Sequence, residues 1–82
     1  MDEPQEQFLR AVYAVQDEVG RAGVMAISEQ LGLDIIRNKA DRDLYRELSL
    51  GLRNDGYLEC LANDYGVTCG IVRLTETGLG YV

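Results

Sequence analysis

The 82-residue chain carries 14 acidic and 8 basic side chains, for a net charge of −6. Its 46% hydrophobic and 27% charged residues are typical of a globular protein and exclude an intrinsically disordered chain. The apolar runs are far shorter than the roughly 18 residues that a membrane-spanning helix needs, and the acidic N-terminus does not resemble a secretory signal. We therefore expect one cytoplasmic domain (residues 1–82) with a polar tail (residues 1–6) and no membrane partner.

Apolar residues at helical spacing predict a first amphipathic helix from Gln5 or Glu6 to about Glu18. The apolar face of this helix consists of Phe8, Leu9, Val12, Val15 and Val19. Gly20 is placed to end the helix, because glycine adopts the left-handed conformation that often follows a helix.

A short strand and a second helix are expected next. Residues 21–23 are predicted to form a turn, and residues 23–25 are a candidate strand. A helix is predicted from near residue 26 to residue 31, with Ile27 and Leu31 facing inward and Gly32 as its stop. For residues 33–37, a short turn capped by Asp34 and an irregular loop are both open.

A long helix is predicted from about residue 38 to residue 54. Asn38 is a plausible N-cap, and Asp41 three residues later gives an approximate capping box. At about 100° per residue, one face gathers apolar side chains and the opposite side gathers basic ones. The apolar residues are Leu44, Tyr45, Leu48 and Leu52; the basic ones are Lys39, Arg42, Arg46 and Arg53, with Leu50 on the basic side.

The remaining residues predict a two-stranded ribbon. Residues 57–61 have the pattern of a strand, residues 63–66 are rich in turn-forming residues, and residues 67–74 contain β-branched residues typical of a second strand. Thr75 is a candidate cap for a short final helical turn before Gly78.

This order of helix, strand, helix, helix and ribbon resembles the winged helix-turn-helix domains of bacterial and archaeal transcription regulators, such as the MarR and PadR types. The segments that carry the resemblance are Ile27-Ser28-Glu29-Gln30-Leu31-Gly32-Leu33, Leu48-Ser49-Leu50-Gly51-Leu52-Arg53-Asn54-Asp55-Gly56-Tyr57-Leu58 and Ile71-Val72-Arg73-Leu74-Thr75-Glu76-Thr77-Gly78. The resemblance implies an α+β fold, a winged-helix three-helix bundle with a C-terminal β-ribbon wing. It also implies a DNA-binding transcriptional regulator that needs no cofactor.

The resemblance places the third helix in the major groove of double-stranded DNA. The expected DNA-binding residues are Arg37, Asn38, Lys39, Arg42, Arg46, Ser49 and Arg53. Residues 37–53 hold five basic and three acidic side chains, whereas the rest of the chain holds three basic and eleven acidic ones. The segment expected to read DNA is thus the one that is locally basic, although a solvated helix face would show the same pattern.

A different class of function is also open, because a fold does not dictate its function. The acidic total charge, the ribbon tip without Lys or Arg and the apolar end (residues 79–82) would suit a protein-interaction module that does not bind DNA. Either function is compatible with a homodimer formed through the first helix or the C-terminal end. The chain has no histidine and no arrangement of nucleophile, base and orienting group, so we do not expect an enzyme.

Cys60 and Cys69 are a candidate redox pair. If the ribbon turn centres on residues 64–65, the two cysteines face each other across the strands and a disulfide becomes feasible. If the turn centres on residues 65–66, Cys60 faces Ile71 and the pairing is expected to fail. The simpler alternative is two free thiols in small apolar positions. A zinc site is not expected, because two cysteines without histidine cannot supply four ligands.

Overall fold

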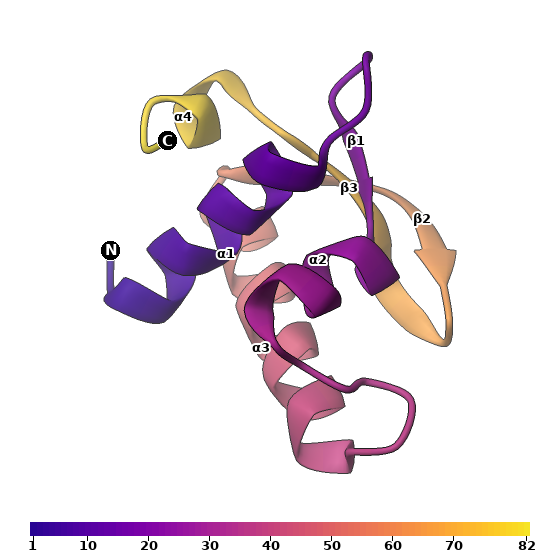
Figure 1. The fold of residues 1–82 in the computed structure, drawn as a ribbon. Helices are drawn as coiled ribbons and strands as arrows, with labels where there is room; N and C mark the ends of the chain where they lie inside the picture. The colour runs from indigo at the N-terminus through magenta and orange to yellow at the C-terminus, as the bar shows by residue number, and fades with distance from the viewer.

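Four helices and a three-stranded antiparallel sheet make up the computed structural model, which describes residues 1–82 (Figure 1). In chain order the elements are α1 (Glu3–Val15), β1 (Arg21–Gly23), α2 (Val24–Leu31), α3 (Lys39–Asn54), β2 (Leu58–Asp64), β3 (Val67–Leu74) and α4 (Glu76–Leu79). The strand order β1-β3-β2 makes β3 the central strand. The predicted α+β class is therefore confirmed. The predicted two-stranded ribbon is also present, and it is the hairpin formed by β2 and β3.

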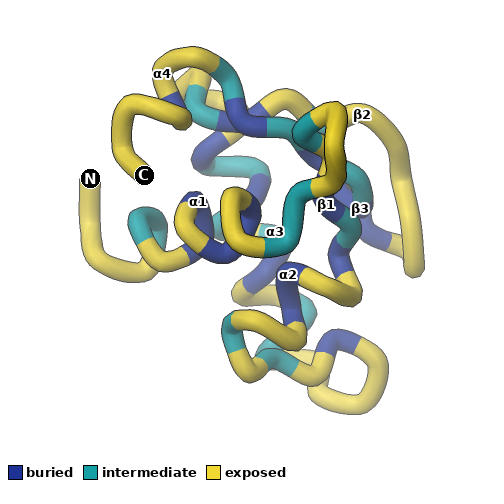
Figure 2. Tube along the Cα trace, turned by 45° about the horizontal axis from the view of Figure 1, so that its top comes forward, coloured by how far each residue is buried: buried dark blue, intermediate teal, exposed yellow.

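The core lies between the helices and one face of the sheet. Its buried apolar residues come from α1, β1, α2, α3, β2 and β3 and from the turn before α3: Phe8, Leu9, Ala11, Val12, Ala22, Val24, Ile27, Ile35, Tyr45, Leu52, Leu58, Val67, Cys69, Val72 and Leu74. Figure 2 colours the chain by burial: buried segments alternate with exposed ones along the helices and strands, and both chain ends and the outer part of the hairpin are exposed. One shared core therefore holds α3 and the hairpin in place.

Helix α1 begins and ends earlier than predicted. The Asp2 carboxylate accepts the Gln5 amide N–H at 3.2 Å, and the Gln5 side chain accepts the Asp2 N–H at 3.3 Å. This reciprocal capping box starts the helix at residue 3, inside the segment predicted to be a tail. At the other end, Asp17 accepts the backbone N–H groups of Val19 and Arg21, which fixes a turn where the helix was expected to continue.

The first strand lies two residues earlier than predicted. Residues 21–23, predicted as a turn, pair antiparallel with β3, with Arg21 opposite Arg73 and Gly23 opposite Ile71. Helix α2 then begins at Val24 and ends at Leu31, and the left-handed conformation of Gly32 (φ +74°) confirms its predicted role as the stop. The strand prediction was wrong because its partner lies about 50 residues away in sequence, where no local pattern reports it.

Helix α3 has the predicted N-cap. The Asn38 side chain accepts the Asp41 N–H at 3.2 Å. The Asp41 carboxylate does not complete a capping box but accepts the Asp34 N–H at 2.9 Å, while Asp34 itself accepts the N–H groups of Ile36 and Arg37. Of the two alternatives for this connection, the turn capped by Asp34 is the one observed.

The apolar face of α3 is rotated relative to the prediction. Tyr45 and Leu52 are fully buried, but Leu44 is exposed, and Leu50, predicted on the basic side, is half-buried against the core. At about 100° per residue, the buried face is centred near Tyr45, Leu52 and Ser49 rather than Leu48. Arg46, on the same side of the helix as Leu50, is bonded to the hairpin turn, so the hairpin lies on this side. A helical pattern taken alone cannot indicate this.

The hairpin turns at Tyr65-Gly66, both with positive φ (+50° and +72°), and Asp64 pairs with Val67. The register between β2 and β3 shifts twice, between Cys60 and Ala62 and between Ala62 and Asp64. Gly70 permits this irregularity, because the Asp64 backbone passes close to it. A Cβ atom at position 70 would lie only 2.7 Å from the Asp64 Cα atom, which is too close for atoms that are not bonded. Strand β2 therefore runs three residues further than predicted, to Asp64.

Candidate nucleic-acid interface

The basic residues of α3 form a stripe along one flank of the helix. At about 100° per residue, Lys39, Arg42, Arg46 and Arg53 align beside the buried face rather than opposite it. Asp43 and Glu47 occupy the middle of the exposed face. We call the four cations together with Arg37, which is exposed in the turn before α3, the basic stripe. The four basic residues of α3 thus share one side of the helix, but two carboxylates lie next to it.

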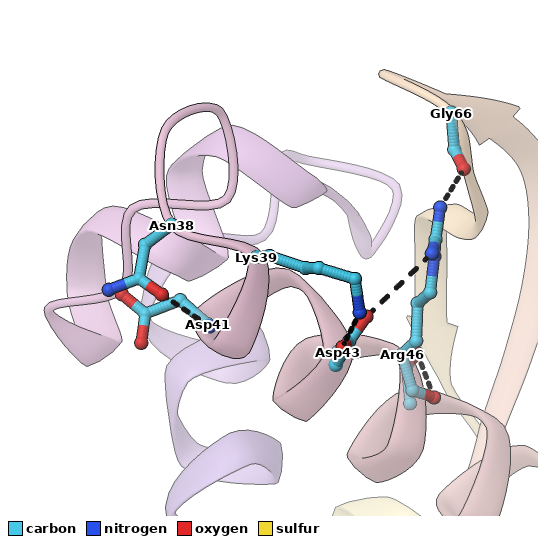
Figure 3. Close-up of polar contacts among 7 residues, drawn as sticks. Asn38, Lys39, Asp41, Asp43, Arg46 and Gly66 are labelled. Atoms are coloured by element: carbon cyan, nitrogen blue, oxygen red, sulfur yellow. Dashed lines mark hydrogen bonds and ion pairs between the residues drawn. The ribbon is translucent and has the colours of Figure 1, made fainter.

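Arg46 connects this stripe to the hairpin (Figure 3). Its Nη2 atom donates a hydrogen bond of 2.9 Å to the Gly66 carbonyl oxygen at the hairpin turn, and its Nη1 atom lies 4.0 Å from the Asp43 carboxylate. The guanidinium group therefore bridges α3 and the turn. The flank of α3 that carries the basic stripe is the flank that faces the hairpin.

Lys39 is paired within its own helix. Its ammonium group lies 2.7 Å from the Asp43 carboxylate, and both side chains are largely exposed. The hydrogen bond from Lys39, aided by the positive charges of Lys39, Arg46 and Arg42, holds the pKa of Asp43 below its ordinary value. An exposed pair of this kind is weak, so an incoming phosphate group can compete for Lys39.

The other predicted contact residues differ in exposure and in hydrogen-bond partners. Ser49 is fully buried, and its hydroxyl donates to the Arg46 carbonyl oxygen at 3.2 Å, so its assignment to the interface was wrong. At about 100° per residue, Ser49 lies next to Tyr45, on the side of the helix that faces the core. Asn38 is exposed but uses its side-chain oxygen as the cap. Arg53 is exposed at the far end of α3, where its guanidinium group bonds the Asn54 side chain.

Tyr45 is a positioning residue that the sequence prediction treated only as core. Its hydroxyl donates a buried hydrogen bond of 2.9 Å to the Cys69 carbonyl oxygen, and its ring centroid lies 5.1 Å from that of Phe8. Together with Arg46, it ties two successive residues of α3 to β3 and the hairpin turn. A tyrosine on a buried helix face is the signal for such a contact, because its hydroxyl needs a partner there.

Because the Tyr45 hydroxyl is buried, we expect the free energy of unfolding to fall at alkaline pH. Burial raises the pKa of Tyr45 above its ordinary value of 10.0, so the folded protein keeps the proton that the unfolded chain releases. The stabilisation is complete below pH 10 and falls by about 1.4 kcal/mol per pH unit above it. Urea unfolding of the parent and Tyr45→Phe between pH 7 and about pH 11.5 should show the parent's advantage shrinking above pH 10. If the free energies of unfolding of the parent and of Tyr45→Phe changed with pH in parallel, the raised pKa assigned to Tyr45 would be contradicted.

The candidate pair is formed: Cys60 and Cys69 make a disulfide between β2 and β3, with Cα atoms 4.8 Å apart, so the alternative of two free thiols is wrong. The turn nevertheless centres on residues 65–66, the arrangement for which pairing was expected to fail. The expectation assumed a regular ladder. The register shifts beyond Cys60 break that regularity, so the simple count across the turn does not hold.

Other surface features offer less chemistry. An open groove of about 440 Å³ between α1 and α2 is lined by Gln7, Arg10, Ala11, Ala14, Gln30 and Leu31. The structure has no group of three or more His, Cys, Asp or Glu side chains arranged to hold a metal ion. None of its helices combines the length and apolar character needed to cross a membrane.

Comparison with known proteins finds no match: no family model, no curated protein and no solved structure matches this chain.

Proposed function

We propose that this chain is a winged-helix DNA-binding domain of a cytoplasmic transcriptional regulator. In this proposal α2 and α3 form the helix-turn-helix, and the β2–β3 hairpin is the wing. The order of elements supports it, and so does the hydrogen bond between Arg46 and Gly66, which holds the hairpin turn beside the third helix. In such domains, the N-terminal residues of the recognition helix contact base edges in the major groove.

The observation that carries the proposal is the basic stripe beside the hairpin. Lys39 is exposed and Arg42 half-exposed in the N-terminal half of α3, and Arg37 is exposed in the turn just before it. Arg46 joins that half to the hairpin turn. In this proposal the helix and the hairpin, joined by Arg46, would both face the DNA backbone. Arginine also has the geometry to contact guanine through two hydrogen bonds.

Binding to DNA should depend strongly on salt. Fluorescence anisotropy with a mixed-sequence duplex at about 50 and 200 mM salt measures this dependence. Arg37→Ala/Arg42→Ala should weaken binding and reduce the slope of log affinity against log salt by roughly 2, one unit for each phosphate group that is no longer neutralised. These two arginines are chosen over Arg46, whose removal would also release the hairpin turn.

The matched control is Arg10→Ala, which removes an exposed cation from α1, away from the basic stripe. It changes the net charge in the same direction but should leave the salt slope close to that of the parent. Equal slopes for all three proteins, or no binding at the lower salt concentration, would overturn the proposal. The control removes one positive charge and the double variant two, so a loss half as large in the control would mean that only total charge matters.

A second candidate is a protein-interaction module of the same fold, with no DNA partner. The observation that favours it is the charge of the outermost surface of α3, where Asp43 and Glu47 are exposed. The hairpin tip adds Asp64 without a compensating cation nearby in sequence. A homodimer through α1 or the apolar C-terminal end would fit either function. Absence of duplex binding at low salt, combined with concentration-dependent self-association, would favour this candidate.

A further inference from the structure

We propose that the Cys60–Cys69 disulfide is a reversible thiol switch that controls how firmly the hairpin tip (residues 61–66) is held against α3. The disulfide would thereby set the affinity of the interface described above. The effect on DNA affinity and the cytoplasmic setting of the switch rest on the proposed function. The effect on the hairpin itself follows from the contacts of the two cysteines.

The disulfide lies where the hairpin is otherwise weakly paired. At the base of the hairpin, Leu58, Glu59 and Cys60 pair in unbroken register with Leu74, Arg73 and Val72. Beyond Cys60 the register shifts twice before the turn. Such bulges interrupt the ladder of backbone hydrogen bonds. The covalent link is therefore the strongest connection between the two strands on the tip side of the hairpin base.

The same part of β3 is bonded to α3. The Cys69 carbonyl oxygen accepts the Tyr45 hydroxyl at 2.9 Å, and the Gly66 carbonyl oxygen accepts the Arg46 guanidinium at 2.9 Å. Tyr45 and Arg46 are neighbours in α3, one facing the core and the other the hairpin turn. Release of the disulfide frees the tip to move away from Arg46. The buried Tyr45 contact would keep β3 itself in place.

The two sulfur atoms differ in access, which sets the order of the chemistry. Cys60 is half-buried and Cys69 has no exposed surface. A thiolate of a low-molecular-weight thiol attacks the Cys60 sulfur, breaks the disulfide and releases Cys69 as a thiolate that takes up a proton. A second thiol then attacks the mixed disulfide and frees Cys60. In total, two thiols are oxidised to one disulfide, and the protein disulfide is reduced to two thiols.

A cytoplasmic setting, as proposed above, would make this bond responsive. Thiol buffers keep most cysteines there reduced, and disulfides that do form in cytosolic proteins are usually transient or redox-sensing. The half-buried Cys60 gives a small thiol a route to the bond. Oxidation would therefore hold the hairpin against α3, and reduction would loosen it.

Amide hydrogen exchange on the full chain in glutathione buffers tests the switch without DNA. Reduction should speed exchange at residues 61–66 by about tenfold or more, while the hairpin base at Leu58–Cys60 changes little. Duplex affinity, measured in the same buffers, should fall by about three- to tenfold, because DNA must then order a mobile tip. The Cys60→Ser/Cys69→Ser variant should match the reduced protein in every buffer.

Two results would overturn the switch: equal exchange of residues 61–66 in both states, or a disulfide that survives excess reduced glutathione in the native protein. If the serine variant does not fold, comparing the amide exchange of the oxidised and reduced parent protein still tests the switch. Faster exchange on reduction with no DNA binding in either state would support the switch and reject the DNA-binding function. Faster exchange with unchanged DNA affinity would overturn its proposed role at the interface.

Discussion

Replacing Phe8 by alanine should lower the free energy of unfolding by about 3–5 kcal/mol, the range for removing a buried aromatic ring. Phe8 has no exposed surface, and its ring packs at 60° to that of Tyr45. A domain of this length is stable by roughly 4–12 kcal/mol, so the substitution removes a large share of the total. Urea unfolding followed by circular dichroism measures the loss.

Tyr13→Ala is the matched control, since it removes an aromatic ring from the same helix. The Tyr13 side chain is 52% exposed, so its removal should change stability by only about 0.5 kcal/mol. Comparable losses for the two variants would contradict the placement of α1 against α3. They would show that Phe8 does not pack in the core described here.

Loss of the disulfide should be the next most damaging change. The cysteines are separated by nine positions, and the loop-entropy relation then assigns the bond roughly 2.5 kcal/mol. The Cys60→Ser/Cys69→Ser variant should therefore melt about 10–20 °C below the oxidised parent. Thermal unfolding with and without a reductant measures the difference.

The reductant supplies the control for that experiment. It should destabilise the parent by a similar amount and leave the serine variant unchanged. A parent whose melting temperature does not respond to complete reduction would show that the bond contributes no stability. Reduction of the disulfide would then not increase the conformational entropy of the denatured chain.

Much of the fold was predictable from short stretches of sequence. Asn38 and Thr75 cap the helices that follow them, and Gly32 ends α2 in the left-handed conformation. The second strand of the hairpin has the predicted bounds. Each of these features depends on residues that are close to each other in the sequence. Their chemistry is therefore visible without knowledge of the rest of the chain.

The candidate site was predictable in composition but not in arrangement. The basic residues of α3 could be identified from helical spacing, yet Ser49 was assigned to the surface and is buried. The contact between Arg46 and Gly66 joins positions 20 residues apart. Which side of α3 the hairpin covers depends on packing against α1 and the sheet, so a helical pattern alone could not determine it.

The sequence alone determined the caps of α3 and α4, the end of α2, the hairpin and the locally basic third helix, because these depend on neighbouring residues. The tertiary structure decided that residues 21–23 are a strand and that Cys60 reaches Cys69 across a shifted register. It also decided that Arg46 is bonded to the hairpin turn. These features need partners far away in the chain, and such partners come together only when the core forms.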